Sequence, residues 1–459
     1  MFERWVYWWA MNKPTKRKYQ WRPMAAILLA IALLVASCSI KQKETLAPAD
    51  RTKILSAKEA KEDALWLVDL IEATHPEFLN YAEFEKYPRE QYSAIKEDFL
   101  GQASADMSVE QFALLCGYYL AALQDGHTSL SPFPNEARLP LAFHWNLDGL
   151  FFAPDSPHRF DGHVTTIGKI DLELLGETID TYTSSENEAG RYYNRSMYAG
   201  LRKYHMAAGL ALRDDMDIHC ENNVGSGSLL VLDYDTSSTS TQRNSFEFTL
   251  LEDGSIAYMV ANLCTKDDSW EAANALLAQA INNGVRKVII DISANPGGDS
   301  SVWDAIFTAL GFQGYPATFG SIRRHSELAK STTLRGLSLT GESSYNEPQN
   351  PTIDMEAYSI DLVVIVSERT FSSAMFFAGA VRDAEVGTII GRVPGNNVSH
   401  FGYPAQFTIP HSRLQGGVST HYWMRPNPQN GSGALMLDRE VPFGEEALAV
   451  AVAMLQETP

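Results

Sequence analysis

One segment sets the predicted architecture: Asp361-Leu-Val-Val-Ile-Val-Ser-Glu-Arg-Thr-Phe-Ser-Ser-Ala-Met-Phe-Phe-Ala-Gly-Ala380. Leu362 to Val366 is a short, β-branched apolar run between polar residues, which predicts a buried strand of a parallel sheet. Apolar residues at helical spacing follow from Ala374 to Val381. A pair of serines, Ser372 and Ser373, therefore lies where a central strand turns into a helix.

The position of this serine pair allows two interpretations. In open α/β sheets, binding and catalytic sites form at the carboxyl ends of the strands. A serine at a helix N-terminus can act as a nucleophile, because the free backbone N–H groups there can bind an oxyanion. Ser372 or Ser373 can equally be an ordinary helix cap, and the segment alone leaves both possibilities open.

Strand and helix patterns alternate along the C-terminal half of the chain. Strands are predicted at 256–263, 287–292, 362–366 and 388–390, and helices at 269–282 and about 301–310. Such alternation predicts an α/β fold, a sheet with helices on its faces. The polar connection 314–358 is expected to be a surface excursion.

The N-terminal part is predicted to be helical. Two capping boxes, Ser56-Ala-Lys-Glu59 and Ser108-Val-Glu-Gln111, begin helices, and a further helix is expected over 89–100. The last of these helices leads into Gln124-Asp-Gly-His127, where Gly126 suits the left-handed position past a helix end. His127 is thus placed on a turn, where it can be catalytic or simply a favourable partner of the helix dipole.

Residues 140–250 show a weaker pattern, with strand-like runs at 164–167, 229–232 and 246–251 and a helical segment over 173–212. We expect an inserted β-rich module there. Nucleic-acid binding is disfavoured, because the 459-residue chain has a net charge of −19. A Gly-x-Ser-x-Gly elbow, a His-Glu-x-x-His motif and a P-loop are all absent from the sequence.

The first residues predict that the protein is exported from the cytoplasm. Basic residues precede the apolar run Ala25 to Ala36, which fits a secretory signal and is short for a membrane span. The run ends in Val35-Ala36-Ser37-Cys38, which resembles a bacterial lipobox. Residues 1–37 are therefore expected to be a lipoprotein signal peptide, Cys38 the lipidated residue and 38–55 a tether. Cys116, Cys220 and Cys264 do not make a disulfide framework, although one disulfide is possible.

Three turns occur in a defined order: Asp125-Gly-His-Thr128, Ser293-Ala-Asn-Pro-Gly-Gly298 and Thr370-Phe-Ser-Ser-Ala374. With this set, from about Ser56 to Val441, the chain resembles the tail-specific or carboxyl-terminal processing serine peptidases of family S41. The resemblance implies a crotonase-like α/β core over 255–450. It also implies an N-terminal helical subdomain over 56–135 and an inserted, degenerate PDZ-like module over 140–250.

The same resemblance implies site residues and a reaction. Ser372 would be the nucleophile that hydrolyses peptide or protein substrates, with Gly297 or Gly298 and the N–H of Ser373 as oxyanion donors. No metal or cofactor is implied. One branch of the family uses a lysine after the serine as the base, but Asn397 occupies that region here. The chain is closer to the tricorn-like branch, whose histidine corresponds to His127.

Three further residues complete the expectations. His400 is a spare candidate for the base, and Asp438 or Glu440 is a candidate carboxylate to orient His127. The predicted protein is a lipid-anchored serine peptidase of the cell envelope, periplasmic or on the outer membrane. The alternative is a catalytically degenerate binding or scaffold lipoprotein with the same fold.

Overall fold

The computed structural model describes residues 49–457, except 86–88, 155, 158–161, 212–214, 223–226, 237–242, 313–317, 331–340 and 350–358. The predicted signal peptide, Cys38 and most of the tether lie outside the described residues. Within the part that is described, no helix has the length and apolar character needed to span a bilayer. Cys116, Cys220 and Cys264 are buried free thiols, so the disulfide left open by the sequence does not form among them.

The central element is a six-stranded sheet with the order β10-β11-β12-β15-β16-β19. Its strands are β10 (Phe246–Leu251), β11 (Ile256–Ala261), β12 (Lys287–Asp291), β15 (Asp361–Val366), β16 (Thr388–Gly391) and β19 (Arg439–Glu440). Only the pair β10–β11 is antiparallel; the other four pairs are parallel. The predicted α/β class is confirmed, and every strand expected between Ile256 and Ile390 is present.

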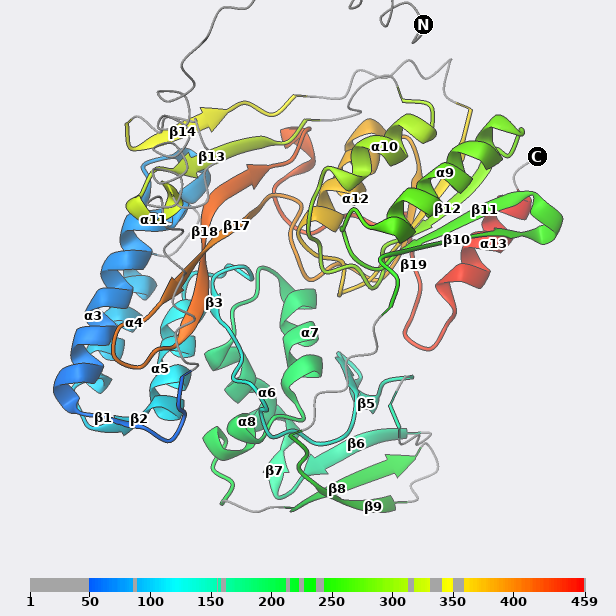
Figure 1. Ribbon diagram of the computed structural model, residues 1–459. Coiled ribbons are helices and arrows are strands. Elements are labelled where there is room, and N and C mark those ends of the chain that lie inside the picture. Colours follow the sequence, from blue (N-terminus) through cyan, green and yellow to red (C-terminus); the bar gives the residue numbers. More distant parts are fainter. Residues whose placement is uncertain are drawn as a thin grey trace, which may run out of the picture. The chain divides into compact units, whose positions relative to one another are not determined.

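Helices cover both faces of this sheet, because its strands are apolar on both sides (Figure 1). The helices are α9 (Asp268–Asn282), α10 (Val302–Ala309), α12 (Ser373–Ala384) and α13 (Ala447–Glu457). Val288 and Val364 belong to the core that includes Trp303 of α10 and Phe377 of α12. The alternate residues Ile289 and Val363 belong to a second core with α13.

A second sheet, with the order β14-β13-β18-β17, was not predicted. It contains β13 (Gly320–Arg324), β14 (Ser343–Asn346), β17 (His400–Thr408) and β18 (Gln415–Met424), and β3 (Ser129–Leu130) pairs with β18. The short helix α11 (Glu327–Lys330) lies between β13 and β14 in the chain. The expectation of a surface excursion over 314–358 is therefore wrong at β13, where Ile322 is fully buried.

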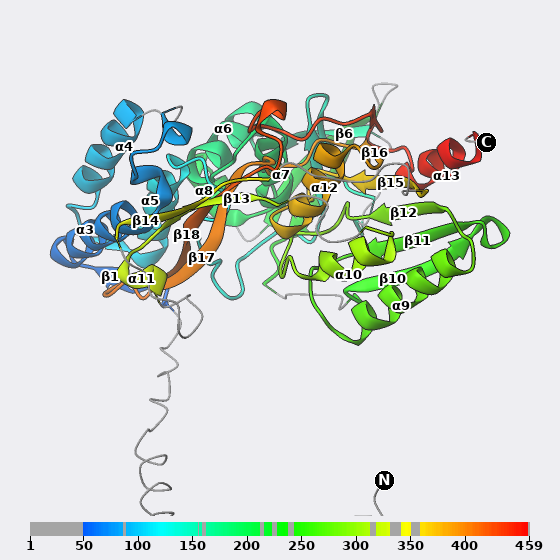
Figure 2. The same ribbon diagram turned by 90° about the horizontal axis from the view of Figure 1, so that it is seen from above.

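The predicted N-terminal helices pack on this second sheet (Figure 2). They are α3 (Ala57–Thr74), α4 (Arg89–Gln102) and α5 (Val109–Ala121), and the strands β1 (Ile54–Leu55) and β2 (Met107–Ser108) pair nearby. Both predicted capping boxes are formed. One apolar core joins these helices to Phe407 and Val418 of β17 and β18. Short 3-10 helices occur at Pro76–Phe78, Ala82–Phe84, Glu252–Gly254 and Pro428–Asn430.

The inserted segment has its own sheet and its own apolar core. The strands are β4 (Phe143–Asn146), β5 (Gly149–Phe152), β6 (Gly162–Ile167), β7 (Ile170–Asp171), β8 (Asp215–Asn222) and β9 (Gly227–Asp233). The helices are α6 (Leu172–Tyr182), α7 (Glu188–Tyr198) and α8 (Arg202–Ala207), as the helical pattern predicted. The predicted boundary at residue 250 is wrong, because β10 pairs with β11 in the central sheet.

Candidate active site

Ser372 lies in a strained turn between β15 and α12. Its backbone has φ 53° and ψ −121°, a region that a residue with a Cβ rarely adopts, at a cost of about 1–3 kcal/mol. The Ser372 hydroxyl makes no capping hydrogen bond to α12, and the Ser373 hydroxyl donates instead to the carbonyl of Gly298 at 2.6 Å. The simple capping interpretation therefore does not describe either serine.

Hydrogen bonds from neighbouring loops hold this turn in place. The N–H of Ser372 donates to Oδ1 of Asn396 at 2.6 Å, and the N–H of Phe371 donates to the carbonyl of Asn295 at 2.9 Å. The buried hydroxyl of Thr370 donates to the carbonyl of Ile292 at 2.9 Å. Fixed partners on both sides explain how the unfavourable dihedral angles of Ser372 are maintained.

The glycine turn after β12 lies against the two serines. A Cβ on Gly297 would come within 2.6 Å of Cβ of Ser372 and 2.9 Å of the Ser373 nitrogen. The Gly297 N–H, however, already donates to Oδ1 of Asn295 at 2.8 Å. Among the described residues, no group accepts the N–H of Gly298 or of Ser373. Of the two predicted glycine donors, Gly298 is thus the one with an available N–H.

His127 comes to the serine turn on the loop that follows α5. Its N–H donates to Oδ1 of Asp125 at 2.8 Å, and its ring contacts that of Phe371, with centroids 4.6 Å apart. The expected left-handed conformation belongs to Gln124, with φ 49°, and not to Gly126. Gly126 is required for a different reason, since a Cβ there would lie 2.7 Å from the Phe371 ring.

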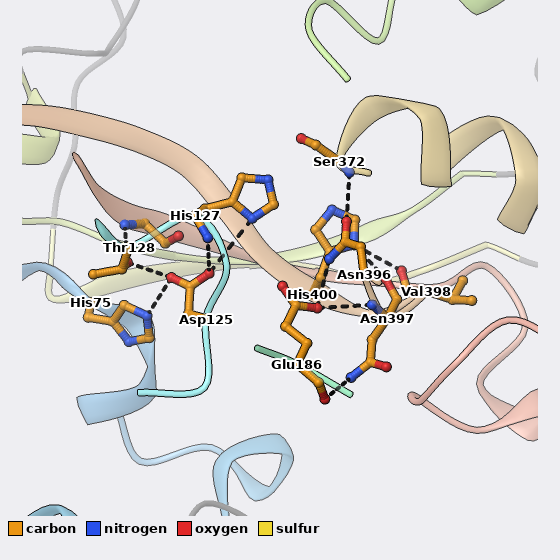
Figure 3. A network of polar contacts seen from close by, with 11 residues as sticks. His75, Asp125, His127, Thr128, Glu186, Ser372, Asn396, Asn397, Val398 and His400 are labelled. Carbon is orange, nitrogen blue, oxygen red and sulfur yellow. Dashed lines mark hydrogen bonds and ion pairs between the residues drawn. The ribbon is translucent and has the colours of Figure 1, made fainter. Parts of the chain in front are cut away.

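Figure 3 shows the hydroxyl of Ser372 directed toward the side on which the imidazole of His127 lies. The His127 side chain is only 8% exposed, and neither ring nitrogen has a hydrogen-bond partner among the described residues. Nδ1 lies 3.7 Å from Oδ1 of Asp125, which is fully buried. The structure therefore brings the predicted Ser372 and His127 into one site, with the imidazole not engaged elsewhere.

Asp125 is the centre of a buried hydrogen-bond network (Figure 3). Its Oδ2 accepts hydrogen bonds from Nε2 of His75 at 3.1 Å and from the hydroxyl of Thr128 at 2.5 Å. Burial alone would raise the pKa of Asp125, but the hydrogen bonds and charges of His127 and His75 hold it well below its usual value. Asp125 is therefore a carboxylate. The sequence analysis did not assign a role to Asp125 or to His75.

Glu186, which the sequence analysis also missed, reaches the site from the inserted segment. Its Oε2 accepts hydrogen bonds from Nδ2 of Asn396 at 2.7 Å and from the N–H of Asn397 at 3.0 Å. Loss of hydration and, second, the charge of Asp125 raise the pKa of Glu186 to about 8. No local motif marks Glu186, because it lies in a short turn between α6 and α7.

The structure does not bring the predicted carboxylates Asp438 and Glu440 to His127. Asp438 binds the guanidinium of Arg382 at 2.6 Å and accepts the N–H of Ile389 at 2.7 Å. Glu440 is exposed on the edge strand β19. The carboxylates beside the imidazole are Asp125 and Glu186 instead, since one oxygen of each lies within 4.8 Å of a ring nitrogen of His127.

The spare candidate His400 lies behind His127, with parallel rings whose centroids are 5.6 Å apart. Its Nδ1 is within hydrogen-bond distance of the carbonyls of Asn397 and Val398. Burial, and second the charge of His127, lower the pKa of His400 to about 3. A neutral imidazole on backbone carbonyls supports the loop beside Ser372 and packs against His127.

Comparisons with known proteins agree with this fold. Residues 255–426 match the sequence profile described as peptidase family S41. The structure of mature CPAF complexed with lactacystin is similar with a TM-score of 0.61 and 12% identity, over 87% of this chain and 96% of that one. The structure of mature CPAF gives the same values. The photosystem II D1 C-terminal processing protease has a TM-score of 0.45 and 13% identity, over 83% of this chain and 93% of that one. None of the curated proteins compared with this chain matches it.

The fold is thus one that known peptidases share. More particularly, the match to peptidase family S41 covers residues 255–426, which include strands β11 to β16 and Ser372. At 12% identity, the likeness to CPAF shows a shared fold and nothing finer. The family of the domain supports a serine-type hydrolase that acts on peptides or proteins.

Proposed function

We propose that this protein is a serine peptidase that cleaves peptide bonds with Ser372 as the nucleophile and His127 as the base. One observation carries the proposal: Ser372 occupies a strained turn beside two available N–H groups, and its hydroxyl is directed toward the side of an imidazole whose nitrogens have no hydrogen-bond partner among the described residues. Nucleophilic catalysis requires a serine hydroxyl and an imidazole that come within hydrogen-bond reach of each other. Nε2 of His127 has no hydrogen-bond partner among the described residues, so it is available to Ser372 for this purpose.

In the proposed mechanism, Nδ1 of His127 faces Asp125, so Nε2 is the atom that accepts the proton of Ser372. Oγ of Ser372 then forms a bond to the carbonyl carbon, and the carbonyl oxygen becomes an oxyanion. The N–H groups of Gly298 and Ser373 stabilise that charge. The imidazolium returns its proton to the leaving amine as the C–N bond breaks, and water hydrolyses the acyl-enzyme by the reverse sequence.

The carboxylate of Asp125 supports this proton transfer. It lies 3.7 Å from Nδ1 of His127 and is held as an anion by its hydrogen bonds. A carboxylate there stabilises the imidazolium and selects the tautomer whose Nε2 is free to accept a proton. The proposed site thus follows the histidine-dependent branch of the family, and Asn397, in the region where the other branch has a lysine, donates its side chain to the Glu186 carbonyl at 3.1 Å.

Two further parts of the proposal concern architecture and location. The central sheet is proposed to be a crotonase-like core, and the inserted segment a degenerate PDZ-like module. The lipobox-like sequence ending in Cys38 supports a lipid-anchored protein of the cell envelope. Growth with a radiolabelled fatty acid tests the anchor, because Cys38→Ala must lose the label that the wild type carries.

Labelling with a fluorophosphonate serine probe tests the catalytic proposal. We expect the wild type to be labelled, and Ser372→Ala and His127→Ala to lose the label. Ser93→Ala, on the exposed face of α4, and His411→Ala, which pairs with Glu62 at 3.0 Å, are matched controls that must retain it.

The other outcomes are equally informative. A folded wild type that stays unlabelled would favour a binding or scaffold protein that keeps the fold without the chemistry. Labelling that survives His127→Ala would move the base elsewhere, with His400 the nearest imidazole. A labelled enzyme justifies a search with peptide libraries for the cleavage preference, measured as kcat/KM.

A further inference from the structure

Asp125, His127 and Glu186 bring together three atoms of the kinds that bind metal ions. One ring nitrogen of His127 and one oxygen of each carboxylate all lie within 4.8 Å of one another. Zn²⁺ binds such atoms at about 2.0–2.2 Å, so two of its ligands are at most roughly 4.4 Å apart. Side-chain movements of a few tenths of an ångström would therefore bring the three atoms to one ion.

Three polar atoms of this cluster have no hydrogen-bond partner among the described residues, which distinguishes it from an ordinary acidic surface. Both ring nitrogens of His127 and Oε1 of Glu186 are buried and accept or donate no hydrogen bond among the described residues. The imidazole of His127 is 92% buried, since only 8% of the side chain is exposed. Buried polar atoms normally have a partner, and here two such side chains face a third that carries a negative charge.

The three ligands come from two different parts of the chain. Asp125 and His127 follow α5 in the N-terminal helical part, whereas Glu186 precedes α7 in the inserted segment. Hydrogen bonds fix the other atoms of the two carboxylates: Asp125 to His75 and Thr128, and Glu186 to Asn396 and Asn397. Such outer contacts orient metal ligands in known sites.

We propose that Asp125, His127 and Glu186 form a binding site for a divalent transition-metal ion such as Zn²⁺, and that the bound ion inhibits the peptidase. One imidazole and two carboxylates are borderline-to-hard ligands that suit Zn²⁺, and the ion displaces the proton of Glu186 into solvent as it binds. The inhibitory half of this inference rests on the proposed function, because it assumes that His127 is the base; the binding half does not.

Inhibition follows from the chemistry of the imidazole ring. A neutral imidazole has one N–H and one acceptor nitrogen. Nδ1 is the nitrogen that faces Asp125, so an ion held there leaves the ring proton on Nε2. Nε2 then cannot accept the proton of Ser372, and no nucleophile forms. The ion also occupies the lone pairs of Asp125 that would stabilise an imidazolium.

Isothermal titration of tag-free protein with ZnCl₂ tests the binding half. The Ser372→Ala protein is used, because it retains all three ligands and cannot digest itself. We expect one Zn²⁺ per chain, and a dissociation constant at least about tenfold weaker in the double variants that add Glu186→Gln or His127→Gln. Glu188→Gln is the matched control, since Glu188 lies two residues away, is exposed and pairs with Arg191 at 3.0 Å.

Failure of the Ser372→Ala protein to bind Zn²⁺, or binding that Glu186→Gln and His127→Gln both leave unchanged, would overturn the proposal. Two ligand variants are used so that a folding defect in one, checked by circular dichroism, does not decide the result. Fluorophosphonate labelling of the wild type with and without ZnCl₂ tests the inhibitory half. We expect ZnCl₂ to abolish labelling and a chelator to restore it. Labelling of the Glu186→Gln protein must be less sensitive to ZnCl₂ than labelling of the wild type.

These readouts separate this proposal from the proposed function. If the wild type is never labelled but Zn²⁺ binds through Glu186 and His127, the peptidase assignment fails and the metal site stands. If labelling is normal and unaffected by Zn²⁺ that is bound at this site, the inhibitory half is wrong.

Discussion

Nε2 of His75 donates a hydrogen bond to Oδ2 of Asp125 at 3.1 Å, across fifty residues of sequence, and both side chains are fully buried. Nδ1 of His75 in turn accepts the N–H of Glu77. This second contact fixes the tautomer of His75, so that its Nε2 carries the hydrogen. Asp125 is thereby held between two imidazoles, His75 on one oxygen and His127 on the other.

His75 is therefore expected to act as a positioning residue for Asp125 and His127. His75→Leu removes the donor, and kcat should fall about 10–100-fold with little change in KM, as for other residues that orient active groups. His75→Gln can still donate and should recover part of the loss. Steady-state kinetics on a peptide substrate distinguish the two variants. Equal kcat values for Leu and Gln would show that the hydrogen bond to Asp125 does not matter for the rate.

Asp125→Asn tests the charge beside the base. The amide cannot stabilise an imidazolium, and kcat should fall about 10³–10⁴-fold, as in other serine hydrolases that lose this charge. Asp63→Asn is the control, because Asp63 is equally buried but accepts the N–H groups of His411 and Ser412, at 2.8 and 2.7 Å, away from the imidazoles of the site. We expect both variants to lower the free energy of unfolding, measured with urea, and only Asp125→Asn to lower kcat.

Gly297→Ala tests the contact between the glycine turn and the nucleophile. The added Cβ would lie 2.6 Å from Cβ of Ser372, so the serine or the turn must move. We expect probe labelling to fall at least about 100-fold, the loss seen when oxyanion geometry is disturbed. Gly284→Ala is the control: Gly284 has φ 98°, close to the 103° of Gly297, and has open space around it. It should lose about 1–3 kcal/mol of stability, because alanine rarely adopts such a φ, and keep full labelling.

The raised pKa of Glu186, about 8, predicts how stability depends on pH. Between pH 4.5 and 8, Glu186 is protonated in the folded chain and ionised in the unfolded one, so the folded state binds more protons. The free energy of unfolding from this group therefore decreases as the pH rises through this window, by at most about 1.4 kcal/mol per pH unit.

Urea unfolding at pH 5, 6, 7 and 8 measures this effect. Glu186→Gln should flatten the slope relative to the wild type, whereas the exposed Glu188→Gln should leave it unchanged. The contribution of Asp125 is common to all three proteins and cancels in the differences. Parallel curves for the wild type and Glu186→Gln would contradict the raised pKa.

The central sheet could be predicted from sequence because its strands and helices have strong local patterns. Leu362 to Val366 is apolar throughout, and it is buried on both faces as β15. The second sheet could not be predicted in this way. Strand β18 contains Ser419, Thr420 and His421, which are all buried although they are polar. The Thr420 hydroxyl donates to the carbonyl of Tyr403 at 2.8 Å, and the Ser419 N–H donates to the hydroxyl of Thr128 at 3.0 Å. No local pattern reports such distant partners.

The site was predictable only where its residues lie on recognisable turns. Ser372 and His127 follow a strand and a helix, and the structure brings both to one place. Glu186 has no such signal, because its partners Asn396 and Asn397 are more than two hundred residues away. A side chain decides which glycine can be an oxyanion donor. Oδ1 of Asn295 accepts the N–H of Gly297, so the N–H of Gly298 is the one that stays available. These choices are made by tertiary contacts and not by sequence spacing.

Because the inserted segment supports the site, the serine turn is complete only after distant parts of the chain have been made and folded. A Cβ on Gly190 of α7 would lie 2.5 Å from the carbonyl of Gly395, so the insert is packed directly on the loop that holds Ser372. Asn396, His127 and Glu186 must all be in place before the serine turn is supported. A chain still emerging from the ribosome, or a fragment cut before Asn396, contains the nucleophile without its support. In the proposed peptidase, hydrolysis would therefore begin only once these long-range contacts have formed.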